Sequence, residues 1–235
     1  MMSTNDDFSF IEVCAGAGGL SKGFINKGFK PIILNDHDKV CCRTLKANHP
    51  NANIYQGSFV EIDMNQYIGI DLLMGGVPCQ SFSQSGNREG LDDERGNLLL
   101  EFIKIVIKIR PKVFLIENVK GLTTHDKGET FKSILQELNN IEHYDINYKI
   151  LNANDYGVPQ KRERLIIIGV NTDLVTKKYN YPKEKDYKPV LRDVLNNVPD
   201  SPGYEYKGRK KEIMEMVPEG GCWVATSSKK VDISL

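Results

Sequence analysis

Short apolar runs of β-strand type alternate with helix-like segments through residues 8–170 of this 235-residue chain. The pattern predicts strands over residues 8–14, 30–36, 51–57, 70–76, 112–119, 144–153 and 162–170. Helical spacing of apolar residues predicts helices over residues 20–28, 38–50, 97–110 and 129–141. Because parallel strands need helical crossovers of this length, we expect an α/β fold with a doubly wound, mostly parallel sheet covered on both faces.

The amino-acid composition of the sequence changes after Asn171. Residues 172–235 are rich in lysine, tyrosine and proline and lack long apolar runs. We therefore expect one domain over residues 1–171 and a C-terminal extension over residues 172–235. Within this extension the sequence favours a linker with one short helix at residues 190–198, and the last stretch forms no obvious unit.

Composition excludes few classes of function. Lys plus Arg and Asp plus Glu both number 31, so zero net charge neither supports nor excludes a nucleic-acid partner. No apolar run approaches membrane-spanning length, and the N-terminus does not resemble a signal peptide. An odd cysteine count without framework spacing favours free thiols in a reducing, cytoplasmic compartment. The five are Cys14, Cys41, Cys42, Cys79 and Cys222, and with four histidines and no C-x-x-C pair we expect no metal site.

A glycine-rich turn follows the first predicted strand, in the run "EVCAGAGG". Gly16, Gly18 and Gly19 would let a ligand approach the backbone where a helix begins, which is typical of a nucleotide-cofactor turn. Asp36 ends the second strand, where an acidic residue suits a ribose diol and disfavours a phosphate. The alternative is a tight turn without a ligand.

Two chemically distinctive residues follow later strands. Cys79, in "PCQ", comes just after the fourth strand and opens a long polar loop, and Glu117, in "ENV", ends the fifth. Parallel strands deliver their carboxyl ends to one crevice, so Cys79 as a nucleophile could lie near Glu117 as a proton donor. The alternatives are a buried structural cysteine and a capping or salt-bridged carboxylate.

The run "QKRER" precedes the last strand of this part. In an extended segment Arg162 and Arg164 share one face, with Lys161 and Glu163 on the other. An arginine pair suits oriented hydrogen bonds to a phosphate, a carboxylate or a base edge. The alternative is an ordinary charged entry to a strand.

These four motifs, in this order, resemble those of the DNA cytosine-5 methyltransferase family. The similar stretches are "IEVCAGAGGLSKGF", "GGVPCQSFSQSG", "DDERGNLLLEFIKIVIKIRPKVFLIENVKG" and "LNANDYGVPQKRERLIIIG". The resemblance implies a Rossmann-like methyltransferase fold, S-adenosyl-L-methionine as the methyl donor, and double-stranded DNA with a flipped cytosine as the substrate.

The resemblance also implies roles for the catalytic residues. The Cys79 thiolate would add to C6 of cytosine, Glu117 would act at N3, and C5 could then take the methyl group. Arg162 matches the position that holds the base, and Arg164 matches its companion. The residues expected to contact DNA are Gln80, Ser81, Ser83, Gln84, Ser85 and Gln160.

The residues expected to bind the cofactor are Cys14, Ala15, Gly16, Gly18, Gly19, Asp36, His37, Ser58, Pro78 and Leu98. Three of them depart from the family pattern. Many members have Phe in place of Cys14, a large aromatic in place of His37 and Asp in place of Ser58. These departures put the affinity for the cofactor in doubt more than the chemistry.

The resemblance further implies a target-recognition region and two more motifs after residue 235. "VPEGGCW" resembles the entry to that region. We therefore expect residues 1–171 to form the cofactor-binding and catalytic domain, and residues 172–235 to form a linker and the start of an incomplete recognition region. A second polypeptide would supply the rest, and no membrane partner is expected.

Of three other hypotheses about the function, two stay open. The chain could be a catalytically silent remnant that binds DNA or cofactor, or an RNA cytosine-5 methyltransferase of the same fold. A dehydrogenase is disfavoured, because it gives "PCQ" and "ENV" no role.

Overall fold

A computed structural model describes residues 8–78, 98–196, 198, 203, 205–218 and 221 of the chain. The chain divides into two compact units, Met1–Leu191 and Arg192–Leu235. None of the helices in these described ranges is long and apolar enough to cross a membrane.

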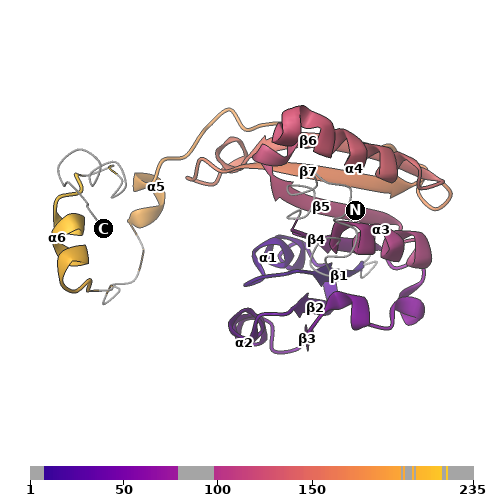
Figure 1. Cartoon of the computed structure of the whole chain (residues 1–235), viewed down its shortest axis with the longest axis horizontal. Coiled ribbons are helices and arrows are strands. Elements are labelled where there is room, and N and C mark those ends of the chain that lie inside the picture. Colours follow the sequence, from indigo (N-terminus) through magenta and orange to yellow (C-terminus); the bar gives the residue numbers. More distant parts are fainter. Residues whose placement is uncertain are drawn as a thin grey trace, which may run out of the picture. The chain divides into compact units, whose positions relative to one another are not determined.

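The described part of the first unit contains a seven-stranded sheet in the order β3-β2-β1-β4-β5-β7-β6 (Figure 1). The neighbours from β3 to β5 pair in parallel, and β7 runs antiparallel to both β5 and β6. The strands are β1 (Ser9–Val13), β2 (Lys30–Asp36), β3 (Asn53–Gln56), β4 (Leu72–Gly75), β5 (Val113–Val119), β6 (Tyr144–Asn152) and β7 (Glu163–Asn171). The predicted strands and the mostly parallel α/β class are confirmed.

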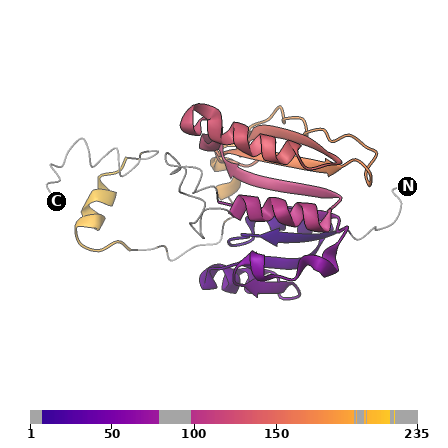
Figure 2. The same ribbon diagram turned by 45° about the vertical axis from the view of Figure 1, so that its right-hand side comes forward.

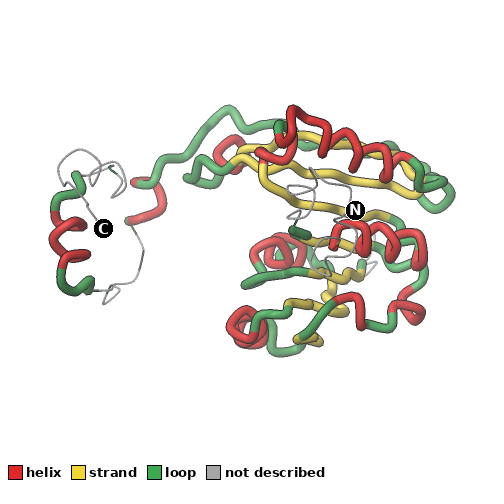
Figure 3. Tube along the Cα trace, in the orientation of Figure 1, coloured by secondary structure: helices red, strands yellow, loops and turns green. Residues whose placement is uncertain are grey.

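The four predicted helices of this unit are also present, with ends shifted by a few residues (Figure 3). They are α1 (Gly19–Ile25), α2 (Lys39–Asn48), α3 (Leu98–Ile109) and α4 (Glu129–Asn139). The helix α2 begins where it does because the Asp38 carboxylate accepts hydrogen bonds from the backbone N–H groups of Val40 and Cys41. Short 3₁₀ turns that the sequence did not predict are η1 (Phe59–Glu61), η2 (Met64–Tyr67), η5 (Lys120–Thr123), η6 (His125–Gly128) and η7 (Ala153–Tyr156).

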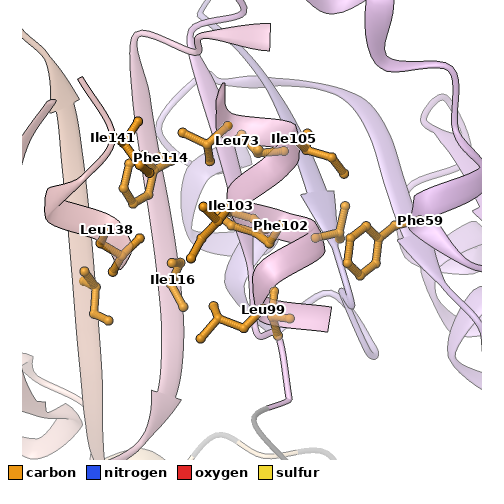
Figure 4. Packing of buried hydrophobic residues seen from close by; sticks show 14 of the residues in the cluster. Phe59, Leu73, Leu99, Phe102, Ile103, Ile105, Phe114, Ile116, Leu138 and Ile141 are labelled. Carbon is orange, nitrogen blue, oxygen red and sulfur yellow. The ribbon is translucent and has the colours of Figure 1, made fainter. Parts of the chain in front are cut away.

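Helices cover both faces of the sheet (Figures 1 and 2). Two apolar clusters, which take alternate residues of the strands, lie on the opposite faces beneath these helices. On one face, α3 and α4 pack on alternate residues of the strands, and Figure 4 shows Phe102 of α3 beside Phe114 of β5. Their ring centroids are 6.4 Å apart in an edge-to-face arrangement. On the other face, α1 and α2 cover the alternate set that includes Phe10 and Leu34. Because helices cover the two faces of the sheet, the ends of the strands are the places where a site could form.

The antiparallel direction of β7 follows from its connection. Only residues 153–162, with the short turn η7, join β6 to β7. A stretch of this length without a helix cannot cross the sheet to start a parallel strand, so the two strands form a hairpin. The strand β7 is thus the antiparallel member of a mostly parallel sheet, and its direction determines where Arg164 lies.

Residues 172–191 belong to the first compact unit. The Tyr181 hydroxyl donates hydrogen bonds to the backbone carbonyls of Asn147 and Ile166, which pins this segment to β6 and β7. In the second unit the described residues include α5 (Arg192–Leu195) and α6 (Arg209–Glu215). The sequence predicted a longer helix at the first position and none at the second. The division into a catalytic and a recognition region stays a prediction.

Candidate active site

The glycine-rich turn connects β1 to α1 through residues with positive φ angles. Cys14, Gly16 and Gly18 have φ values of 53°, 56° and 84°. A Cβ atom at Gly18 would lie 2.8 Å from Cδ2 of Leu45 in α2, so a larger residue there would collide with the helix as well as strain the backbone. The turn is therefore left-handed at these three residues and closely packed at Gly18.

Asp36 closes this turn from the neighbouring strand. Its Oδ2 accepts a hydrogen bond of 2.8 Å from the Gly16 N–H, and its Oδ1 accepts one of 2.9 Å from the Asp38 N–H. The residue is 8% exposed. The structure thus brings together two of the predicted cofactor residues, the glycine turn and the acid at the end of β2.

The other predicted cofactor residues lie near strand and helix ends. The exposed His37 has its Nδ1 3.5 Å from Oδ1 of Asp36. The exposed Ser58 precedes η1, the half-buried Leu98 begins α3, and the exposed Pro78 follows β4 by a few residues. Ala15 is buried, and its N–H donates to the carbonyl of Asn35 in β2.

Glu12 is a buried acid that the sequence analysis did not single out. It is 1% exposed, and no hydrogen bond reaches its Oε2 within the described residues. Burial is the main cause that raises the pKa of its carboxyl to about 7, while hydrogen bonding to Ser21 opposes the shift and Asp36 adds to it. The signal was a single acid inside the apolar run "FIEVC".

The Cys14 thiol lies beside these acids. Burial, and then the charges of Asp36 and Glu12, raise the pKa of this thiol to about 12. A thiol with so high a pKa stays protonated at neutral pH and is a poor nucleophile. Cys14 is therefore unsuited to the nucleophilic role that the sequence assigns to Cys79.

Glu117 and Arg164 form an ion pair at the end of β5. The Arg164 Nε lies 2.8 Å from Oε1 of Glu117, and the side chains are 26% and 28% exposed. The antiparallel register places Arg164 opposite Val119. Glu117 is two residues before Val119 and therefore on the same face of β5, so the Arg164 side chain can reach it. The second oxygen, Oε2, lies 3.3 Å from where a Cβ of Gly76 would be, so it faces the chain segment that leaves β4.

That segment leads toward the predicted nucleophile. The buried Asn118 donates a hydrogen bond of 3.0 Å from Nδ2 to the carbonyl of Val77, which fixes the segment against β5. Asn118 was not among the predicted site residues, although it stands in the "ENV" motif. Cys79 itself, with Gln80, Ser81, Ser83, Gln84 and Ser85, lies outside the described residues.

Arg162 and Gln160 are exposed. The Arg162 backbone N–H donates to Oδ1 of Asn152 at 3.1 Å, while within the described residues no hydrogen bond or ion pair engages its guanidinium. Glu163 pairs instead with Lys120, at 3.0 Å between Oε1 and Nζ. Neighbours in the "QKRER" run thus have different partners, and Arg162 keeps its side chain available.

The model of the family described as C-5 cytosine-specific DNA methylase matches residues 8–226. The chain belongs to this family. It is 45% identical over 226 residues to the Type II methyltransferase M.PspPI of Psychrobacter sp., covering 92% of this chain and 54% of that protein. It is 39% identical over 229 residues to M.Eco47II of Escherichia coli, covering 94% of this chain and 55% of that protein. The chain thus spans about half the length of these relatives.

A shorter member of the family also matches. The Type II methyltransferase M.AquIA of Picosynechococcus sp. is 40% identical over 174 residues, covering 68% of this chain and 70% of that protein. The stretch aligned with M.AquIA is shorter than the stretch aligned with M.PspPI, yet it covers a larger share of its relative. M.AquIA is therefore much the shorter of the two relatives.

Solved structures confirm the fold of a Rossmann-like methyltransferase. A prophage-encoded protein of Escherichia coli, described as a DNA modification methyltransferase, has a TM-score of 0.66 and 26% identity, covering 94% of this chain and 68% of that one. The Entamoeba histolytica methyltransferase EhMeth has a TM-score of 0.64 and 20% identity, covering 83% of this chain and 62% of that one. Family and fold do not give a role to any single side chain, so the predicted catalytic, cofactor and DNA contacts stay predictions.

Proposed function

We propose that this chain transfers a methyl group from S-adenosyl-L-methionine to C5 of cytosine in double-stranded DNA. The observation that carries the proposal is the Glu117–Arg164 pair, whose second carboxylate oxygen faces Gly76, three residues before Cys79. Membership of the cytosine-specific family supports the substrate class.

The residues at the ends of β1 and β2 fit the methyl donor. Asp36 offers a carboxylate, and the turn at Gly16 leaves open space, since a Cβ atom built there has no neighbour within 4 Å. A carboxylate next to an open glycine turn suits a nucleoside whose ribose hydroxyls donate hydrogen bonds. When bound, S-adenosyl-L-methionine supplies an activated methyl group.

The chemistry assigned to this chain is covalent catalysis. The Cys79 thiolate adds to C6 of the flipped cytosine, and the electron pair of the C5–C6 double bond becomes available at C5 to form the bond to the methyl group. Glu117, oriented by Arg164, brings a proton to N3, which neutralises the negative charge that thiolate addition places on the ring, and it takes that proton back when the ring is restored. Loss of the C5 proton and departure of Cys79 then restore the double bond. Arg162, whose guanidinium has no partner among the described residues, holds the base.

We further propose that target recognition depends on a second polypeptide. The motifs assigned to catalysis fall within residues 8–170, while nearly half of M.PspPI lies outside the aligned part. Base-edge contacts, which specify a DNA site, would come from that second chain. The alternative is a silent remnant, and a less favoured one is an RNA substrate.

Transfer of tritiated methyl groups tests this proposal. The full chain is assayed on DNA of mixed sequence and on RNA, with and without a complementing polypeptide that carries the part of M.PspPI outside the aligned stretch. We expect methylation of DNA at defined sites only when both are present. Sequence-specific methylation by this chain alone would refute the need for a partner, and inactivity with the partner would favour the silent remnant.

A further inference from the structure

The segment over residues 179–189, here called the strap, crosses the β6–β7 hairpin. One end is anchored by the Tyr181 hydroxyl, which donates to the carbonyls of Asn147 at 3.1 Å and Ile166 at 2.9 Å. The Tyr181 ring also packs edge-to-face on Tyr179, with centroids 5.0 Å apart. Because one hydroxyl meets carbonyls on both strands, the strap has a fixed starting point on the hairpin.

The other end of the strap contacts the turn η7 through an ion pair and hydrogen bonds. The Lys188 Nζ lies 2.6 Å from Oδ1 of Asp155, whose side chain is 17% exposed. The Lys185 N–H donates to the Asp155 carbonyl at 2.8 Å, and Nδ2 of Asn154 donates to the carbonyl of the buried Pro189 at 2.9 Å. A surface turn thus receives an ion pair and two hydrogen bonds from one short segment.

The strap also covers the glycine that ends this turn. Gly157 has a φ of 93°, and a Cβ atom there would lie 2.7 Å from Nζ of Lys185. The Tyr156 hydroxyl reaches the carbonyl of Pro182 at 3.4 Å. The turn and the strap are therefore packed against each other on several sides.

The turn η7 is also hydrogen-bonded to the backbone of Arg162. The Ala153 N–H donates to the Arg162 carbonyl at 3.0 Å, and Oδ1 of Asn152 accepts from the N–H groups of both Arg162 and Asn154. The backbone of Arg162 thus moves with η7. A continuous set of contacts runs from Lys188 through Asp155 and η7 to the arginine whose side chain is available to a ligand.

We propose that Asp155 and Lys188 are positioning residues for Arg162, and that the strap sets the place of the base-holding arginine. The inference rests on the proposed function for its catalytic consequence. An ion pair this exposed on its lysine side adds little to global stability, whereas a small displacement of a substrate-holding group costs much of its rate. A loss of rate without a loss of stability is therefore the signature of positioning.

The first test measures the turn in the full chain alone. In Lys188→Ala we expect backbone amide exchange within residues 153–162 to speed up by about tenfold, and trypsin to cleave faster after Lys161 and Arg162. Lys188→Arg keeps the charge and should restore both. The matched control is Lys183→Ala, which removes the same charge from the strap but has no partner in the described part of the chain. Unchanged exchange in Lys188→Ala would overturn the proposal.

The second test measures catalysis with the complementing polypeptide. We expect Lys188→Ala and Asp155→Asn to lower kcat by about tenfold while KM for S-adenosyl-L-methionine and the midpoint of thermal unfolding stay unchanged. Lys183→Ala should leave kcat unchanged. Faster exchange with an unchanged kcat would show that the strap holds the turn without serving the reaction, and would overturn the proposal. An inactive parent would instead refute the proposed function, and the exchange test would still decide whether the strap holds Arg162.

Discussion

Glu12 couples the stability of the protein to pH. Its carboxyl lies near the end of β1, one of its oxygens has no hydrogen-bond partner in the described part of the chain, and burial raises its pKa from 4.5 to about 7. A raised folded-state pKa means that the folded protein keeps a proton that the unfolded chain releases. Stability from this group is therefore complete below about pH 4.5 and is lost as pH rises toward 7.

We predict that Glu12→Gln removes this loss. The amide cannot ionise, so the free energy of unfolding at pH 8 should rise by up to about 3 kcal/mol, and its fall between pH 4.5 and 7 should flatten. Urea denaturation across this pH range measures both effects. The control is Glu137→Gln on the exposed face of α4, which should change neither. A variant that is less stable than the parent at pH 8 would contradict this account of Glu12.

Asp36 is the residue on which the nucleoside proposal depends. We predict that Asp36→Ala weakens binding of S-adenosylhomocysteine by at least about tenfold, because the ribose loses its acceptor and the Gly16 N–H loses its partner. Isothermal titration calorimetry gives the affinity, and Asp63→Ala, at the start of η2, is the control. Equal affinity in Asp36→Ala, or binding of NAD in place of S-adenosylhomocysteine, would refute the assignment.

Residue by residue, the sequence predicted which side chains stand at the strand ends but did not give their contacts. The glycine turn and Asp36 were expected to serve one ligand, and the structure joins them by a hydrogen bond. A salt-bridged Glu117 was the alternative that the sequence left open, but Arg164 as its partner was not predicted, because that contact needs the antiparallel register of β5 and β7. Register depends on packing between segments far apart in the chain, and local spacing carries no record of it.

At the scale of elements, the hairpin β6–β7 places Arg164 against Glu117 of β5. Both strands were predictable from their apolar runs. The direction of β7, however, depends on the length of the connection that joins it to β6. Likewise, the polar run that forms α6 has too few apolar residues to show helical spacing. The strap was expected to be part of a linker, because its anchors are single tyrosine and lysine side chains and not an apolar pattern.

Gly169 tests how tightly β7 packs on β5. It pairs with Phe114, and a Cβ atom at Gly169 would overlap the Phe114 ring. This ring is fully buried and lies 5.4 Å from the ring of Tyr144 between centroids, so it has little room to move. We predict that Gly169→Ala lowers the free energy of unfolding by about 2 kcal/mol, measured by urea denaturation.

The matched control for Gly169 is Gly23→Ala. Gly23 lies within α1, and a Cβ atom there meets nothing within 4 Å. Alanine at a helical position of this kind should leave stability unchanged or raise it by up to about 1 kcal/mol. If both variants proved equally stable, the close packing of β7 against Phe114 would be wrong.

At the scale of the whole molecule, the question is how the proposed catalysis and the proposed recognition of a DNA site are divided. The chain belongs to the cytosine-specific DNA methylases and spans about half the length of the relatives that it matches over most of its own length. The catalytic chemistry is assigned to the first compact unit, and site recognition to a second polypeptide. The two proposals can be tested separately, because the proposed covalent attack on cytosine depends on Cys79 and the proposed site recognition does not.

Trapping on DNA that carries 5-fluorocytosine tests the central claim most directly. Fluorine at C5 cannot leave as the proton does, so the adduct between Cys79 and C6 should persist after methyl transfer. With the complementing polypeptide and S-adenosyl-L-methionine, the parent chain should form a denaturation-resistant complex whose cross-linked peptide contains Cys79, and Cys79→Ser should form none. A complex of equal yield in Cys79→Ser, or a cross-link at another residue, would contradict the claim.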